Sequence, residues 1–254
     1  MSREEQWARM SRRARMVLLA LGLAAFGICL GLAFVQLPSF GSTDHPYRDA
    51  AVPVSAAHAT ANVVSSVNFD QRALDTLGEE TILLGSVIGA AALLRPSKEE
   101  QEEGPSPTGR VLTPTKILGG VMFPTTLVIG VDVVTHGAVT PGGGFQGGIV
   151  LATGLHLLYV GGSYRTLERL RPVRIFEHTE ALGAASFACL GLAGIATSAA
   201  FLANMIPTGP FGQLFSAGTV PLLNGAVGLE VASGIVVLLA KFLDQAILLG
   251  PDSS

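Results

Sequence analysis

Several acidic side chains lie inside long apolar runs, where a carboxyl group could bind a proton or a cation. Glu230 lies about nine residues into the apolar run 221–248. An ionisable side chain at mid-bilayer costs about 2.5–3.5 kcal/mol, so it must face protein or water. On a helix, Ala226, Ser233 and Gly234 share its face, which predicts that Glu230 points into a seam of small residues. Glu230 could relay protons or cations, and the alternative is an interhelical hydrogen bond.

Three more acids, Asp75, Glu79 and Glu80, open the apolar run 74–94. Acids suit the beginning of a helix because its N-terminus carries a partial positive charge. Two acids four residues apart cannot both serve as caps. Asp75 and Glu79 are therefore also candidates for a cation entry site.

Histidines provide the remaining candidates. Asp132 precedes His136 by four residues at the end of the run 116–135, the spacing of a helical ion pair. Because histidine titrates near neutral pH, this pair could pass protons, and a purely structural pair is the alternative. His156 stands alone in the run 145–161, where the alternative to a relay role is a neutral, hydrogen-bonded imidazole.

Two further groups are expected to lie at the membrane surface. Glu177 and Glu180 flank the start of the run 180–204 and are interpreted as cap acids. Lys241 and Asp244 have the spacing of an i, i+3 ion pair. Neither group is expected to belong to an ion pathway.

The elements that position these residues are membrane spans. Of the 254 residues, 49% are hydrophobic and 14% are charged, compared with about 25% charged in an average soluble domain. A bilayer core of about 30 Å needs about 20 apolar residues in a helix. The sequence therefore predicts an all-α integral membrane bundle of about six transmembrane helices, at residues 17–36, 74–94, 116–135, 145–161, 180–204 and 221–248.

Basic residues predict the orientation of these spans. Five arginines precede the first span, and four basic residues follow each of the second and fourth spans. The alternate segments hold two, none and none. Because basic segments stay in the cytoplasm, both termini are expected to be cytoplasmic. With a net charge of −3 and no clustered basic stripe, the chain is not expected to bind nucleic acid.

The segment HGAVTPGGGFQGG, residues 136–148, joins two spans without a single charged residue. Its residues Pro141 to Gly144 could turn the chain sharply, since glycine tolerates positive φ. Gly144 and Gly148 are four residues apart, a spacing that lets membrane helices pack closely. The alternative is that exposed amides at this helix start face an ion path. Asn224, near the beginning of the last span, is expected to hold a helix contact.

No motif indicates catalysis. The sequence has no nucleophile paired with a base, no nucleotide-binding loop and no Cys/His set with metal-ligand spacing. Neither an enzyme activity, a cofactor nor a resident metal is therefore predicted.

Three segments resemble known membrane proteins. HGAVTPGGGFQGG resembles the signature HGHxSPGGGFQGG of the MnhB (MrpB) subunit of Mrp-type cation/proton antiporters. The segment PLLNGAVGLEVASG, residues 221–234, is similar to the motif of that family near its last helix. ANVVSSVNFDQRALDTLGEETILL, residues 61–84, resembles the carboxyl end of the large MrpA protein and the equivalent small subunit of membrane-bound hydrogenases. The first signature includes Pro141, Gly142, Gly143, Gly144, Phe145, Gln146, Gly147 and Gly148.

The resemblance implies a division of the chain and a function. Residues 1–96 would form a two-helix module like the MrpA tail, 97–112 an acidic cytoplasmic linker, and 113–254 a four-helix MnhB-like domain. The chain would be a membrane subunit of a Na⁺/H⁺ or related antiporter in a prokaryotic plasma membrane. Its partners would be other Mrp-type subunits, H⁺ and Na⁺ or another monovalent cation. The alternatives are a subunit of a redox-driven, hydrogenase-like complex and a purely structural bracing subunit.

Overall fold

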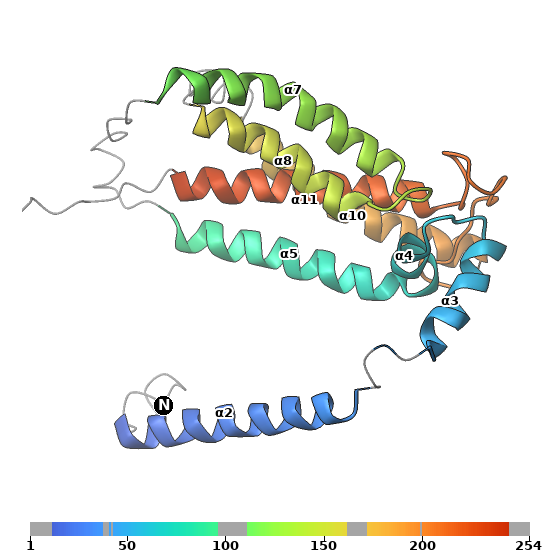
Figure 1. Ribbon diagram of the computed structural model, residues 1–254, viewed down its shortest axis with the longest axis horizontal. Helices are drawn as coiled ribbons and strands as arrows, with labels where there is room; N and C mark the ends of the chain where they lie inside the picture. Colours follow the sequence, from blue (N-terminus) through green and yellow to red (C-terminus); the bar gives the residue numbers. More distant parts are fainter. Residues whose placement is uncertain are drawn as a thin grey trace, which may run out of the picture. The chain divides into compact units, whose positions relative to one another are not determined.

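The computed structural model describes residues 12–37, 41, 43–95, 111–161, 172–198 and 200–243, and every regular element within these ranges is a helix (Figure 1). The chain divides into two compact units, residues 1–46 and 47–254. In the first unit, α2 (Arg12–Val35) has a 20-residue apolar stretch, Met16–Val35, whose side chains are all exposed. A helix that is apolar on every side is typical of a membrane span.

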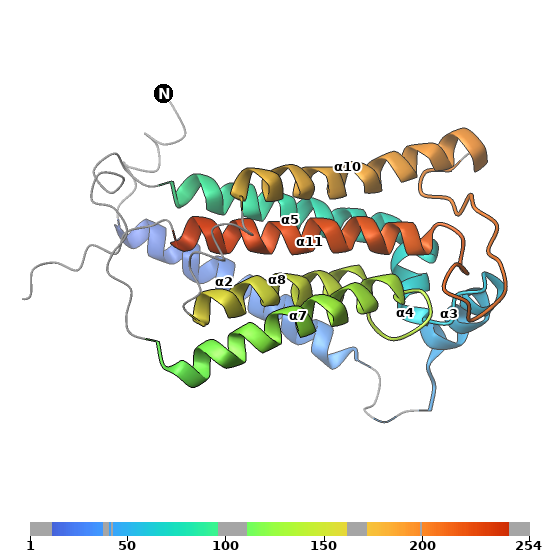
Figure 2. The ribbon, with the colours of Figure 1, turned by 90° about the horizontal axis from the view of Figure 1, so that it is seen from above.

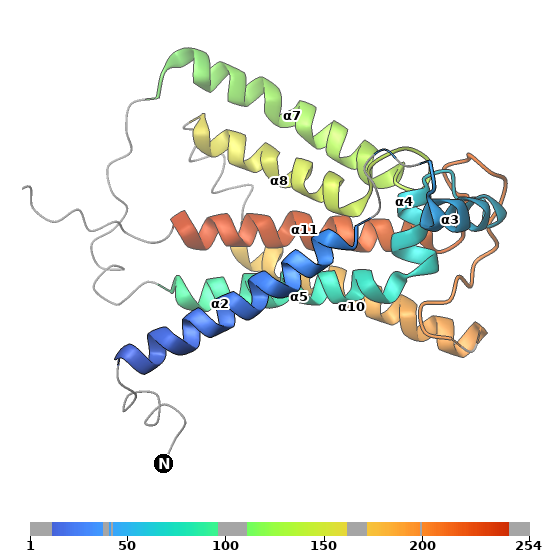
Figure 3. The ribbon, with the colours of Figure 1, turned by 60° about the horizontal axis from the view of Figure 1, so that its bottom comes forward.

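The second unit is a helical bundle built around its last helix. Its elements are α3 (Pro46–Ala57), α4 (Val63–Ser66), the π-helix η1 (Val67–Gln71), α5 (Ala73–Leu93), α7 (Thr113–Thr135), α8 (Gly144–Val160), α10 (Val173–Ser198) and α11 (Val220–Leu243). Helix α11 lies between the pair α7–α8 and the pair α5–α10 (Figures 2 and 3). In its apolar window 61% of the residues are buried, against 22% or less in α5, α7 and α10. The core of the bundle therefore follows α11.

Five of the described helices are long and apolar enough to cross a membrane: α2, α5, α7, α10 and α11. The sixth predicted span corresponds to α8, an apolar helix of 17 residues. At 1.5 Å per residue, α8 is about 25 Å long, near the lower limit for a span. The prediction of an all-α membrane protein is confirmed, with five long spans and one short apolar helix among the described residues.

The ends of the bundle agree with the alternation of basic residues. The segments 136–143 and 200–219, which contain no Lys or Arg, lie at the same end of the bundle as α3 and α4 (Figures 1 and 2). Within the second unit, the end of α5, the start of α7, the end of α8 and the start of α10, which adjoin basic segments, lie at the opposite end (Figures 1 and 2). The cytoplasmic location of both termini stays a prediction.

Both boundaries of one span differ from the prediction of 180–204, because α10 ends at Ser198 and also begins early. Helix α10 begins at Val173, seven residues before the predicted start of 180. The charged residues Arg174, Glu177 and His178 interrupt the apolar pattern, although they belong to the first two turns of the helix. Glu180 consequently lies inside the bundle.

Residues on both sides of the proposed linker share one hydrophobic core. The ring of Phe69, in η1, lies 6.3 Å from that of Phe187, in α10. Ala73 belongs to the same buried cluster as Leu223, Val227 and Val231 of α11. The proposed linker, 97–112, lies outside the described residues except for its last two positions. The division at that linker stays a proposal based on resemblance.

Candidate ion pathway

The glycine-rich loop between α7 and α8 is held in place by two asparagines. Asn62, which caps α4, donates from Nδ2 to the carbonyl oxygens of Gly137 at 2.8 Å and of Thr140 at 2.9 Å. Gly142 and Gly143 have φ values of +135° and +138°, a conformation that side chains with Cβ rarely adopt. The loop is thus a defined turn whose carbonyls are bonded to a distant part of the chain.

Asn224 of α11 holds the other side of this turn. Its Oδ1 accepts a hydrogen bond of 2.9 Å from the Gly144 amide, and its Nδ2 donates to Ser65 Oγ at 2.9 Å. A Cβ added at Gly143 would lie 2.5 Å from Asn224 Oδ1. The first amide of α8 is therefore bonded to a side chain. In the alternative interpretation of the sequence, this amide would face an ion path.

The following glycines bring α8 against its neighbours. A Cβ at Gly144 would lie 2.5 Å from the Asn224 carbonyl oxygen, and one at Gly148 would lie 2.8 Å from Val231 Cβ. Gly147 is equally tight against Val134 of α7. Phe145 packs against the core, whereas Pro141 and Gln146 are exposed. In this structure the glycines of the signature allow α8 to pack closely against α7 and α11.

Three glutamates from three helices lie buried in the bundle. Glu80 of α5, Glu180 of α10 and Glu230 of α11 are exposed by only 1%, 4% and 0%. Among the described residues, no basic side chain is bonded to either oxygen of Glu80, either oxygen of Glu230 or Oε1 of Glu180. Buried carboxylates normally have such partners. These glutamates are therefore the strongest candidates for binding protons or cations.

The carboxyl groups form a connected series. Glu80 and Glu230 lie close enough to share a hydrogen bond when one of them carries a proton. Glu180 interacts electrostatically with Glu230 and with Glu177. Glu177 Oε1 in turn lies 3.0 Å from Lys241 Nζ. We call Glu80, Glu230, Glu180 and Glu177 the carboxyl series.

The carboxyl series extends along the bundle. Glu80 lies seven residues into α5 and Glu230 ten residues into α11, about 10 Å and 15 Å from the end of the bundle that holds α3. Glu180 lies seven residues into α10, about 10 Å from the opposite end. The carboxyl series therefore occupies the middle part of the bundle.

Small residues make room for the carboxyl series, as predicted for Glu230. A Cβ at Gly183 would lie 2.7 Å from the Glu230 amide nitrogen, and one at Gly234 would lie 2.9 Å from Glu180 Oε1. Beside them, the hydroxyls of Thr179 and Ser233 form a 2.7 Å hydrogen bond between α10 and α11. Glu230 thus points into a seam of small residues between these helices.

The other candidates lie elsewhere. Asp132 and His136 form the expected pair, with Oδ1 and Nδ1 3.0 Å apart, and their side chains are 65% and 40% exposed. Asp75 is exposed and pairs with Arg72. Glu79 is exposed on α5, and His156 is half-buried on α8. Among these candidates, the structure pairs Asp132 with His136. Glu79 is next to Glu80 in the chain but lies on another face of α5.

One interpretation from the sequence is wrong. Glu180 is not an interfacial cap acid, because α10 begins two turns earlier and α11 covers the side chain. Lys241 pairs with Glu177 of α10, and its predicted partner, Asp244, lies outside the described residues, so that pair stays a prediction. A prediction that α10 begins at Val173 would have assigned Glu180 to the bundle interior.

Sequence reasoning also gave no role to one polar pair at the end of the bundle that holds α3. His58 Nδ1 lies 2.5 Å from Oδ2 of Asp70, whose side chain is 4% exposed. Asp70 lies in η1, twelve positions after His58 and beyond a turn and α4, so no regular spacing indicates the contact.

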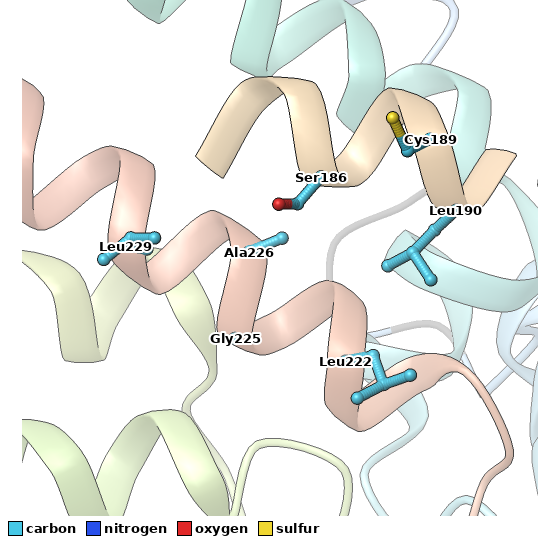
Figure 4. A pocket seen from close by; sticks show the side chains of 7 residues that line it. All are labelled: Ser186, Cys189, Leu190, Leu222, Gly225, Ala226 and Leu229. Carbon is cyan, nitrogen blue, oxygen red and sulfur yellow. The ribbon is translucent and has the colours of Figure 1, made fainter. Parts of the chain in front are cut away.

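A groove on α10 and α11 is apolar, and its lining includes no Asp, Glu, Lys, Arg or His (Figure 4). Its lining residues are Ser186, Cys189, Leu190, Leu222, Gly225, Ala226 and Leu229. The Ser186 hydroxyl and the Cys189 thiol are the polar side-chain groups of this lining. The groove therefore lacks the carboxyl groups that a proton path of the proposed kind needs.

The fold and the apolar helices define a multi-pass membrane protein. Residues 114–237 match the model of a family described as a domain related to the MnhB subunit of Na⁺/H⁺ antiporter. The chain is also 32% identical over 195 residues to protein MJ1307 of Methanocaldococcus jannaschii, covering 68% of this chain and 74% of the relative. The chain belongs to this MnhB-related family.

Other relatives are components of large assemblies. A protein of Rhizobium meliloti, a probable K⁺/H⁺ antiporter A/B subunit, is 28% identical to the chain over 188 residues, covering 64% of this chain but only 18% of that protein. A chain of the membrane-bound sulfane sulfur reductase, an archaeal respiratory membrane complex, is similar with a TM-score of 0.68 and 27% identity, covering 91% of this chain and 98% of that one. A chain of the Mrp complex from Dietzia sp. DQ12-45-1b shares the fold, with a TM-score of 0.65 and 21% identity, covering 97% of this chain and 27% of that one.

Proposed function

We propose that this chain is a membrane subunit of a multi-subunit cation/proton antiporter complex, in which the carboxyl series carries protons through the bundle. Membership of the MnhB-related family supports the assignment to such a complex. The observation that carries the proton pathway is the burial of Glu80, Glu180 and Glu230 with five oxygens that accept no hydrogen bond from the described residues.

Charge balance requires bound positive charge at this site. Three ionised carboxylates in a low-dielectric interior without basic partners would be strongly unfavourable. The site must therefore hold protons or a bound cation. A proton satisfies the Glu80–Glu230 pair directly, because it turns two facing acceptors into a hydrogen bond.

The surroundings of the carboxyl series explain why such a subunit works with partners. At one end Glu79, next to Glu80 in the chain, is exposed on α5, and at the other end Glu177 has a 43% exposed side chain. An exposed acid on a membrane helix is costly unless protein or water covers it. We infer that other Mrp-type subunits cover these ends and continue the path, while supplying the route for Na⁺ or another monovalent cation.

Transport by the assembled complex tests this proposal. Glu80→Gln, Glu180→Gln and Glu230→Gln each preserve side-chain size but cannot release a proton. Each change is expected to lower cation-driven proton movement in inverted membrane vesicles by about tenfold or more, without loss of assembly. The matched control is Asp49→Asn, which neutralises an exposed acid of α3 and should leave transport unchanged. Normal transport by all three glutamine variants in intact complexes would leave only a bracing role.

The similarity to a chain of a respiratory complex favours a second candidate. That chain matches over nearly its whole length, so this protein could instead serve a redox-driven complex that carries the same module. Purification of the intact complex by a tag on this chain separates the two. Iron–sulfur proteins in the purified complex would indicate the redox-driven assembly, and antiporter components without iron would indicate the antiporter.

A further inference from the structure

An ion pair closes the carboxyl series at the end of the bundle where α10 begins. Lys241 Nζ of α11 lies 3.0 Å from Glu177 Oε1 of α10, and the two side chains are 27% and 43% exposed. Glu177 lies one turn before the buried Glu180 and interacts with it electrostatically. The pair is therefore coupled to the carboxyl series through Glu177.

The packing of α10 against α11 keeps these groups in order. The two helices run antiparallel, with Thr179 bonded to Ser233 and Glu180 placed against Gly234. Glu230, Gly234 and Lys241 lie on one face of α11, at spacings of four and seven residues. One face of α11 thus presents an acid, a gap for Glu180 and a base, in that order toward the end where α10 begins.

We propose that Lys241 is a positioning residue of the proton pathway, which neutralises Glu177 and thereby allows Glu180 to release its proton. This inference depends on the proposed function, because it assigns a control to the same path. Lys241 does not carry the transported proton. It acts by setting the charge next to the last buried carboxyl group.

The electrostatic argument gives opposite signs for the two partners. Without Lys241, the carboxylate of Glu177 opposes a second negative charge on Glu180, so Glu180 keeps its proton to higher pH. Glu177→Gln removes the carboxylate that opposes a negative charge on Glu180, and it leaves the ammonium of Lys241, beside position 177 and one turn of α10 from Glu180, without its partner, so the proton leaves at lower pH. Removal of both charges cancels the two effects.

Other ionisable groups on the packed helices stay constant in such a comparison. They are Arg174, His178, Glu180 and Cys189 on α10, Glu230 on α11, Asp75, Glu79, Glu80 and Arg95 near or on α5, His156 and Tyr159 on α8, and Lys116 and Asp132 on α7. Differences between the variants therefore arise at positions 177 and 241.

The experiment compares Lys241→Met, Glu177→Gln and the double variant in the full complex, with Lys241→Arg as the charge-preserving control. Proton movement is measured against pH in vesicles. Infrared absorption of protonated carboxyl groups gives a second measurement on the purified complex, with the Glu180→Gln variant identifying the Glu180 band.

For Lys241→Met the midpoint of the curve of proton movement against pH should move up by about 0.5–1 pH unit, and for Glu177→Gln it should move down by a similar amount. The double variant and Lys241→Arg should stay close to the unaltered protein.

A merely structural ion pair gives a different pattern. Both single variants would then lower activity and thermal stability together, with the pH midpoint unmoved or moved in the same direction, and this result would overturn the inference. The infrared measurement applies even to variants with weak transport, provided that the complex assembles. If instead Glu180→Gln leaves transport unchanged, the proton pathway itself fails, so the two failures are distinguishable.

Discussion

The carboxyl groups of Glu80 in α5 and Glu230 in α11 face each other in a part of the bundle where neither side chain is more than 1% exposed. The residues are 150 positions apart in the chain, and α5 and α11 pack directly against each other. A buried acid pair of this kind can hold one proton between two acceptors.

If Glu80 and Glu230 act in series on one path, the loss of either interrupts it. The double variant Glu80→Gln/Glu230→Gln should then transport protons within about twofold of the slower single variant, because residues acting as a unit are strongly non-additive. Initial rates in vesicles, normalised to the amount of assembled complex, measure this. Losses that multiply would indicate two independent paths.

Gly183→Ala should separate α10 from α11. The added Cβ would lie 2.7 Å from the Glu230 amide nitrogen and 2.8 Å from the Ala226 carbonyl oxygen, which are backbone atoms that cannot rotate away. We expect a loss of about 1–3 kcal/mol in stability together with slower transport. The matched control is Gly225→Ala, on the open groove of Figure 4, where nothing lies within 4 Å of the added atom. Thermal unfolding of the purified complex compares them, and equal midpoints would contradict the close packing.

Asn224→Ala should weaken the junction of α8, α11 and α4. The change leaves the Gly144 amide and the Ser65 hydroxyl without their present partner. Buried polar groups left unpaired cost about 1–3 kcal/mol each, so the total loss should be about 2 kcal/mol or more. Gln146→Ala, at an exposed position of the same signature, should have little effect. Hydrogen exchange of the amides in the loop between α7 and α8 provides the measurement. Unchanged protection of these amides would argue that Asn224 does not hold the loop in place.

His58→Ala should destabilise the α3 end of the bundle. Asp70 is 4% exposed, so removal of its 2.5 Å partner leaves a buried carboxylate unpaired. Because His58 itself is 47% exposed, we expect a loss of about 1–2 kcal/mol, below that of a fully buried pair. Adding Asp70→Asn to His58→Ala should restore part of the loss, since it removes the unpaired charge. Proteolysis of the α3–η1 segment measures the opening, and no recovery in the double variant would contradict the pairing.

The spans and one of the buried acids were predictable because both depend on local features. Length and apolarity locate α5, α7, α8 and α11 to within a few residues. Glu230 stood out because it interrupts an apolar run near its middle, and small residues share its helical face. These signals need no knowledge of neighbouring helices.

The partners of Glu230 were not predictable in the same way. Glu79 and Glu80 are adjacent in the sequence and point about 100° apart on a helix, so only the packing of α5 decides which one is buried. The spacing of the acids favoured Asp75 and Glu79 as a cation site, whereas the structure buries Glu80. Glu180 was missed because charged residues in the first turns of α10 concealed where that helix begins. The contacts of Asn62 and Asn224 join segments about 75 to 160 residues apart, which no local pattern indicates.

Helix α11 uses two different faces for two different tasks, and this limits how the protein can move. Asn224 and Glu230 are six residues apart, so their side chains leave the helix in clearly different directions, one toward α8 and one toward α5 and α10. A rotation of α11 that withdrew Glu230 from Glu80 would also break the bond that anchors the first turn of α8. For a proton path through the glutamates, we therefore expect any opening of the bundle to displace α5 or α10, while α11 stays in place.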